Sequence, residues 1–165
     1  MSGPIGYSVA DLLRFDLTPN WVMKTWNLVT SDLPNTSLTG MRVPIVTGTE
    51  PTDVAGSLTY YFNKNQRLER VTLHGYCADP SSVLALAQQR FALRQYASQG
   101  TPIYLAYFGD QPISIMRVEA MPKKDEGSSS RQYEIDLELN LPRQGAMLSA
   151  DKLMLLFRMR QADMI

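Results

Sequence analysis

His74, Cys77 and Asp79 form the one close cluster of chemically reactive side-chain types in the sequence. They stand where an alternating segment ends and a helical pattern begins. A thiolate and a histidine base form nucleophilic pairs, but such pairs normally meet across a fold rather than three residues apart. We therefore favour a structural interpretation, in which Cys77 is a buried apolar residue, His74 is exposed on a strand and Asp79 caps the helix. An enzyme that uses His74 and Cys77 is kept as an alternative.

A row of carboxylates, Glu134, Asp136 and Glu138, alternates with apolar residues in the most regular strand pattern of the chain. Two-residue spacing places the three on one face of a strand. Paired carboxylates can do acid–base work, but nothing in the sequence indicates a raised carboxyl pKa. We expect these residues to face water and to meet Arg70 or Arg117 on neighbouring strands.

Catalytic and cofactor signatures are missing from the sequence. The glycines do not form a phosphate-binding loop, and no G-x-S-x-G elbow is present. The cluster around His74 lacks the second pair of ligands that zinc usually requires. We therefore predict no catalytic residues, no metal and no cofactor.

Aromatic residues are the candidates for an apolar ligand site between a sheet and its helices. Two of them are tryptophans on one predicted helix, and such large rings most often anchor a core. We favour the core role and keep a domain that binds a small apolar ligand as an alternative. Its lining would be Trp21, Trp26, Tyr60 and Phe91.

The last predicted helix begins after Ser149 and continues through Met164. Its apolar residues extend beyond one stripe, and methionine-rich apolar surfaces adapt to partners. We favour burial of both sides in the chain's own core. The alternative is a surface for self-association or for a protein partner, formed by Leu153, Met154, Leu155, Phe157 and Met159.

The elements that position these residues follow the order α-βββ-α-βββ-α. Thr18 with Pro19 and Asp79 with Pro80 are helix starts, and Gly100 is expected to end the second helix. Segments joined by short turns imply antiparallel strands. The sequence thus predicts an α+β fold with a sheet of about five to six strands and helices packed on one face. The strand segments are 41–47, 58–62, 68–74, 103–108, 113–118 and 133–141.

Composition limits the classes of protein and partner. A length of 165 residues fits a single domain over 1–165, with 1–8 and 122–131 expected to be flexible. Lys plus Arg and Asp plus Glu number 16 each, so no field of one sign attracts nucleic acid. No apolar run approaches the roughly 18 residues of a membrane helix, and no secretory signal is evident.

Two segments carry a resemblance to a known family. They are TPNWVMKTW at 18–26 and RVPIVTGTEPTDVAGSLTYYFNKNQRLERVTLHG at 42–75. The chain from about Asp16 to Pro142 resembles a conserved domain of uncharacterised planctomycete bacterial proteins. That domain has no known chemistry, so the resemblance transfers no functional residues. It implies a hydrophobic N-terminal segment that would place the domain at the envelope, and this chain shows no such segment. We expect an envelope-associated domain if that segment has been removed, and a cytoplasmic protein otherwise.

These observations favour a bacterial protein-interaction or structural module without enzymatic activity. The reasons are the absence of a convergent reactive set and the apolar last helix. We expect a homo-oligomer or a protein partner bound through that helix, no nucleic acid and no membrane span.

Overall fold

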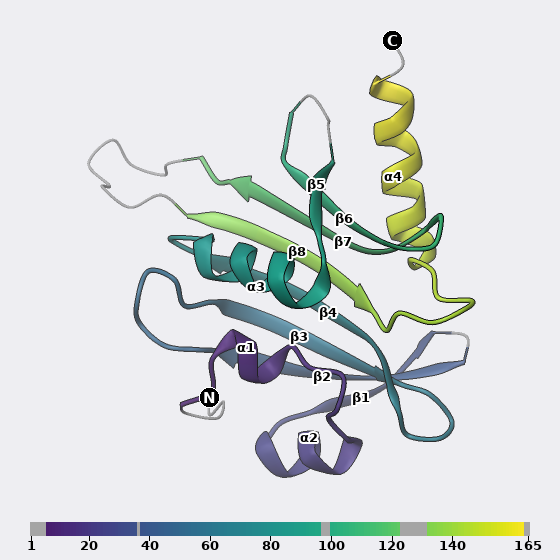
Figure 1. The fold of residues 1–165 in the computed structure, drawn as a ribbon. Helices are drawn as coiled ribbons and strands as arrows, with labels where there is room; N and C mark the ends of the chain where they lie inside the picture. Colours follow the sequence, from purple (N-terminus) through teal and green to yellow (C-terminus); the bar gives the residue numbers. More distant parts are fainter. Residues whose placement is uncertain (1–5, 36, 97–99, 123–131, 164–165) are drawn as a thin grey trace.

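The computed structural model describes residues 6–35, 37–96, 100–122 and 132–163. In these ranges eight strands form one antiparallel sheet, accompanied by four helices (Figure 1). The expected flexibility of 122–131 falls almost wholly outside the described residues. The strands are β1 Thr30–Asn35, β2 Leu38–Val46, β3 Ala55–Phe62, β4 Leu68–Cys77, β5 Arg94–Tyr96, β6 Ile103–Phe108, β7 Gln111–Ala120 and β8 Tyr133–Asn140.

The order of the strands across the sheet is β1-β2-β3-β4-β8-β7-β6-β5. The first four strands are neighbours in the sheet in the same order as in the chain. Helix α3, at Ser81–Phe91, then carries the chain from β4 to the far edge, and β5 to β8 return toward the middle. The two halves of the chain therefore meet where β4 pairs with β8.

The predicted α+β class holds, but the predicted strand count of five to six is too low. The strands that were missed are β1 and β5, which form the two edges of the sheet. Both lack a clear apolar alternation, since β1 reads TSDLPN and β5 reads RQY. Edge strands are covered on fewer sides, so their sequences show less of the pattern that marks a strand.

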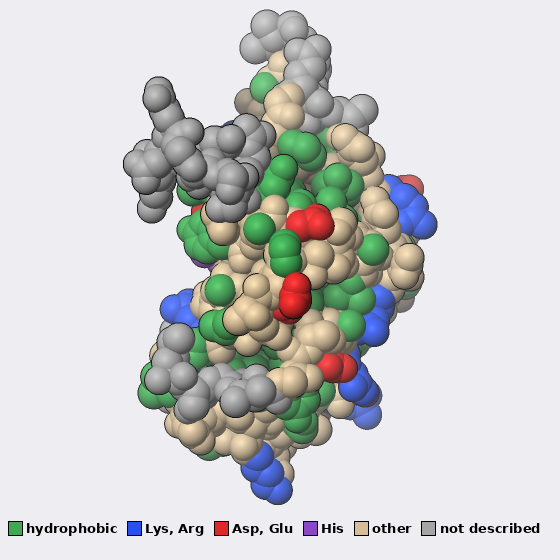
Figure 2. Space-filling model, turned by 90° about the vertical axis from the view of Figure 1, so that its left-hand side faces the viewer, with side chains coloured by type: hydrophobic (Ala, Val, Ile, Leu, Met, Phe, Trp, Pro, Cys, Tyr) green, Lys and Arg blue, Asp and Glu red, His purple; other side chains and the backbone are tan. Residues whose placement is uncertain are grey.

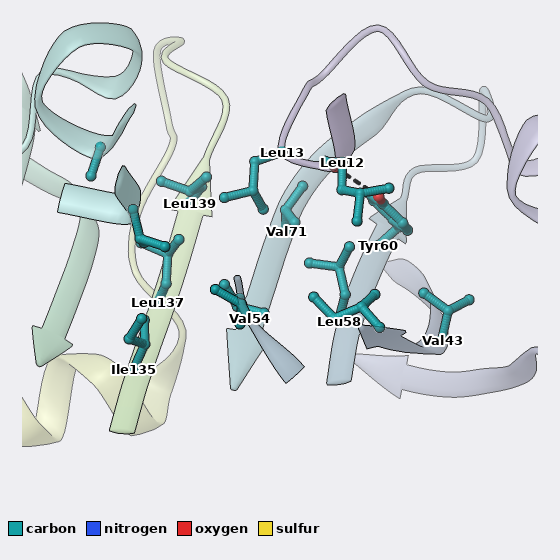
Figure 3. Close-up of a cluster of buried hydrophobic side chains, with 14 of the residues drawn as sticks. Leu12, Leu13, Val43, Val54, Leu58, Tyr60, Val71, Ile135, Leu137 and Leu139 are labelled. Atoms are coloured by element: carbon teal, nitrogen blue, oxygen red, sulfur yellow. Dashed lines mark hydrogen bonds between the residues drawn. The ribbon is translucent and has the colours of Figure 1, made fainter. Parts of the chain in front are cut away.

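One face of the sheet carries the main core, and we name it the three-helix face. Tyr60, Val71 and Leu139 lie in register across β3, β4 and β8, and all three are at most 1% exposed. Figure 3 shows these side chains meeting those of α1, with the Tyr60 hydroxyl donating to the Leu12 carbonyl oxygen at 2.7 Å. The helices on this face are α1 Val9–Leu12, α2 Pro19–Thr25 and α3.

Helix α2 begins as predicted, whereas α3 begins one residue later, with Pro80 rather than Asp79 at its N-cap position, and it does not end at Gly100. The Thr18 hydroxyl accepts from the Trp21 N–H at 3.1 Å, and the Asp79 carboxylate accepts from the Ser81 N–H at 2.9 Å. Helix α3 ends at Phe91, well before Gly100. Ala92 takes a left-handed conformation with φ of 57° and directs the chain into β5. Glycine usually holds that position, so the end gave no sequence signal.

The expectation that all helices pack on one face is wrong. Helix α4, at Ala150–Asp163, lies on the opposite face, which we name the α4 face. Ile115 points to this face while its neighbour Met116 points to the main core, as strand alternation requires. Ile115 belongs to a second buried cluster with Ile103, Leu105, Leu148 and Leu156. Figure 1 shows α4 standing away from the other three helices.

Candidate functional site

The rest of the α4 face is polar, and its side chains follow the register of the strands. Arg42, Thr59, Thr72 and Glu138 are consecutive cross-strand partners on β2, β3, β4 and β8. Three strand gaps of about 4.8 Å make this row about 14 Å wide. Short hydroxyl side chains thus form its middle, and long charged side chains form its two ends.

The rows on either side carry larger side chains. Ser57, His74 and Asp136 are cross-strand partners in one of them. In the other, Tyr61 pairs with Arg70, whose guanidinium carbon lies 6.0 Å from the Tyr61 ring centre. Short residues in the middle and long ones around them leave a hollow over the sheet.

This hollow, which we name the groove, has a volume of about 420 Å³. It lies between the sheet and the first turn of α4. Apart from Leu73, all of its lining residues are polar or charged. They are Arg42, Ser57, Thr59, Tyr61, Arg70, Thr72, Leu73, His74, Asp136, Glu138, Ser149, Asp151 and Lys152.

Thr59 is the most enclosed hydroxyl of the groove. Only 4% of this residue is exposed, and among the described residues its hydroxyl has no hydrogen-bond partner. The hydroxyl oxygen is not sealed from solvent, since no described side-chain polar atom is both inaccessible and unpaired. The Thr59 hydroxyl is therefore free to bond to a molecule in the groove.

Glu138 corrects the expectation that the carboxylates of β8 face water. It is 2% exposed. Its carboxylate accepts from the Ser149 N–H at 2.8 Å and from the Asn140 side-chain amide at 3.2 Å, with Arg70 Nε 4.0 Å away. The negative charge lies at the start of α4, where the free N–H groups of a helix stabilise it. Glu138 is thus buried because α4 covers it.

Asp136 joins the sheet to the same helix. Its carboxylate lies 2.5 Å from Lys152 Nζ and 3.8 Å from an Arg117 nitrogen. The predicted pairing with Arg117 is confirmed, as is that of Glu138 with Arg70. Both carboxylates therefore hold α4 in place and are not available to act as a catalytic pair.

Glu134, at the outer end of the row, pairs with the one histidine of the chain. Its carboxylate lies 3.0 Å from His74 Nε2 and accepts from the Tyr76 hydroxyl at 3.2 Å. The hydrogen bond from His74 is the main reason that the pKa of Glu134 is lowered. His74 is exposed, as predicted, but it is not free.

Two charges of the groove remain unpaired. Arg42 is exposed on β2, and among the described residues it makes no ion pair and no side-chain hydrogen bond. Asp151, in the first turn of α4, is likewise without a partner in that part of the chain. The groove thus has an uncompensated positive charge at its β2 side and an uncompensated negative charge at its α4 side.

His74 and Cys77 do not form a catalytic pair. Three residues apart on β4, they point to opposite faces of the sheet, with His74 on the α4 face and Cys77 in the main core. Cys77 is 3% exposed, and burial raises the pKa of its thiol. The alternative of an enzyme built on these two residues therefore has no geometric basis.

The four aromatic ligand candidates lie on the three-helix face, away from the groove. Trp26 and Tyr60 are buried, and the Trp26 indole N–H donates to the Pro44 carbonyl oxygen at 3.0 Å. Trp21 packs edge-on against Trp26, with ring centres 5.5 Å apart. Phe91 packs edge-on against Phe15 at 6.2 Å. Each ring thus has partners within the chain's own core.

The predicted interaction residues of α4 divide between its two sides. Leu153, Leu155 and Met159 pack against the second buried cluster. Met154 and Phe157 point away from the sheet and are 52% and 57% exposed. One side of the helix is core, and the other presents large apolar side chains to solvent.

Further exposed apolar side chains adjoin the start of α4. Phe108, the last residue of β6 before the turn to β7, and Met147, just before α4, line one hollow. In Figure 1 this turn lies beside the start of the helix. We name the exposed apolar set the end patch, and it consists of Tyr107, Phe108, Met147, Met154 and Phe157. Figure 2 shows another side of the molecule, where hydrophobic side chains are interspersed with polar ones.

Among the described residues, no group of three or more His, Cys, Asp or Glu side chains is placed to hold a metal ion. In the same residues, none of the helices has the length and apolar character needed to cross a membrane.

Sequence reasoning did not identify the hydroxyl residues of the groove or Arg42. Single threonines, serines and arginines on alternating strands are common, so no motif marks them. Only the register of three strands brings Arg42, Thr59 and Thr72 together. The relevant signal was the polar side of each strand, which becomes informative once the strand order is known.

Comparison with known proteins places the chain in a family. No curated protein and no solved structure gave a match. A family model described as a family of unknown function, DUF6690, matches residues 1–161. The predicted resemblance to a domain of unknown function is thereby confirmed, and the chain belongs to the DUF6690 family.

Proposed function

We propose that the chain is a protein-interaction module that pairs with a second copy of itself through the end patch. The observation that carries this proposal is the exposure of Met154 and Phe157 on one side of α4. They are three residues apart, so they are neighbours on the helix surface. Phe108 and Met147 are further exposed apolar side chains, and they line a hollow before the start of the same helix.

The cost of leaving such side chains in water supports association. Full burial of a Phe or Met side chain contributes about 1.5–3 kcal/mol relative to exposure. Met154 and Phe157 are more than half exposed, so most of this contribution is still to be gained on binding. Methionine and phenylalanine are also enriched at protein interfaces.

The charge of the chain favours a second copy as the partner. The formal net charge is zero, so two copies do not repel each other. A two-fold interface requires a surface that is complementary to itself. A helix side with apolar residues meets this condition, because the same side chains pack against each other across the axis.

Light scattering on matched variants tests the proposal. We expect wild type to have the mass of a dimer at micromolar concentration and the double variant Met154→Glu, Phe157→Glu to have the mass of a monomer. Met23→Glu is the control, because Met23 is 65% exposed on α2, outside the end patch. Met23→Glu should keep the dimer mass.

Two results would contradict the proposal. One is a wild-type chain that stays monomeric at all accessible concentrations. The other is a double variant that keeps the dimer mass while remaining folded by circular dichroism. Loss of the dimer in Met23→Glu as well would show that association does not depend on the end patch.

A further inference from the structure

We propose that the groove binds a small hydroxylated molecule with one oxyanion group, such as a sugar phosphate. The inference concerns the polar part of the α4 face and is independent of self-association through the end patch. It rests on the unpaired charge of Arg42, the unpartnered Thr59 hydroxyl and the polar lining of the groove.

The position of the anionic group follows from the charges that are already paired. Lys152 is bound to Asp136, and Arg70 is held by Asn140 and Glu138. Arg42 has no such partner among the described residues. A planar guanidinium binds carboxylate or phosphate oxygens through two parallel hydrogen bonds. The oxyanion therefore belongs at the β2 side of the groove, away from the carboxylates of β8.

The hydroxylated part follows from the floor of the groove. Ser57, Thr59 and Thr72 make no side-chain hydrogen bond with any described residue. Each hydroxyl can both donate and accept, which suits the hydroxyls of a polyol. Asp151, unpaired at the far side, accepts hydrogen bonds from further hydroxyls.

The volume and the polar lining of the groove favour a small polar ligand over an apolar one. A volume of about 420 Å³ lies within the usual range for small-molecule sites. Apart from Leu73 the lining residues are polar or charged, so an apolar ligand would leave their polar groups unpaired, which is costly. A ligand with several hydroxyls and one charge satisfies both the floor and Arg42.

The hydroxyl of the buried residue Thr59 supports a ligand site, because side chains on a solvated sheet face are exposed and bond to water. A side chain that is 96% buried usually forms its hydrogen bond within the protein. Thr59 lines the groove, so a molecule there can reach its hydroxyl. A ligand hydroxyl in the groove would supply the missing partner.

Amide NMR titration with glucose 6-phosphate tests the proposal. We expect saturable shifts confined to residues that line the groove, with weaker binding of glucose and of inorganic phosphate. Arg42→Gln should weaken binding of the sugar phosphate by about tenfold or more, since a charge-assisted bidentate contact is lost. Arg67→Gln, at an exposed arginine outside the groove, should bind as wild type does.

The variant Thr59→Val tests the role of the Thr59 hydroxyl in binding separately from any role in stability. The hydroxyl has no partner in the described chain, so its removal should leave stability nearly unchanged while weakening binding about three- to tenfold. The proposal is overturned if glucose 6-phosphate causes no saturable shift at millimolar concentration. It also fails if Arg42→Gln binds as wild type does, or if inorganic phosphate alone binds as tightly as the sugar phosphate.

Discussion

At the scale of single residues, one row of carboxylates on β8 occupies three different environments. Glu138 is buried under α4, Asp136 is paired with Lys152, and Glu134 is bound by His74 near the edge of the groove. Their sequence spacing is identical, so the differences come from what packs above the strand. Environment, rather than residue type, decides what each carboxylate does.

The pKa of Glu134 gives a prediction at this scale. The hydrogen bond from His74 lowers it below its ordinary value of 4.5. A lowered carboxyl pKa stabilises the fold above the ordinary value, and this contribution is lost as the pH falls through the folded value. We expect His74→Ala to raise the pKa of Glu134 toward 4.5, measured by carbon-13 NMR titration of its carboxyl group.

Arg117→Gln is the matched control for this titration. Arg117 contributes to the lowered pKa of Glu134 only through longer-range charge, which is the smallest of the causes. Its replacement should therefore raise the pKa less than His74→Ala does. An unchanged pKa in His74→Ala, or a larger rise in Arg117→Gln, would contradict the assigned role of the hydrogen bond.

At the scale of elements, α4 is a two-sided helix, and adjacent residues separate its two roles. Leu156 is 3% exposed in the second buried cluster, whereas Phe157 is 57% exposed. Leu156→Ala should lower the free energy of unfolding by about 2–4 kcal/mol, because it leaves a cavity. Phe157→Ala should change it by no more than about 0.5 kcal/mol, as exposed substitutions usually do.

Urea denaturation at a concentration where the chain is monomeric measures both effects. Dilution matters, because association with a second copy would add its own stabilisation. Equal losses in the two variants would mean that α4 is buried on both sides. Negligible loss in Leu156→Ala would mean that the helix is not packed on the sheet.

The sequence predicted helix starts better than helix ends. Thr18 and Asp79 provide cap groups that act locally, so their roles are visible in the sequence. The end of α3 at Ala92 depends on a left-handed alanine. That conformation is unfavourable for alanine and is held by the surrounding fold. Edge strands β1 and β5 were missed for a similar reason, since tertiary pairing rather than local pattern defines them.

The groove could not be predicted, because it depends on long-range order. Arg42 and Glu138 are 96 positions apart in the chain, yet they lie in one cross-strand row. Alternation identified the polar side of each strand but not which strands are neighbours. Glu138 could be predicted to be buried only if α4 were known to pack on the same face of the sheet. The sequence predicted all helices on one face.

At the scale of the whole molecule, the sheet separates two kinds of surface. The three-helix face is filled by the main core. The α4 face is divided between a second buried cluster, the groove and the helix that bears Met154 and Phe157 of the end patch. The surfaces that we propose for binding are thus supplied by the part of the molecule that the main core does not use.

The distance between matching positions in two copies of the chain tests directly whether the copies associate through the end patch. A thiol-reactive spin label will modify the cysteine introduced by Gln161→Cys rather than Cys77 in the folded protein. The reason is that Cys77 is buried and the pKa of its thiol is raised. Gln161 is exposed one turn beyond Phe157 on α4. Met23→Cys, on α2, provides the reference position.

Pulsed dipolar spectroscopy on the two labelled chains then reports which ends of the copies meet. We expect a clear dipolar coupling between copies labelled at 161, at a distance shorter than that for copies labelled at 23. No coupling at 161, or a shorter distance at 23, would contradict association through the end patch.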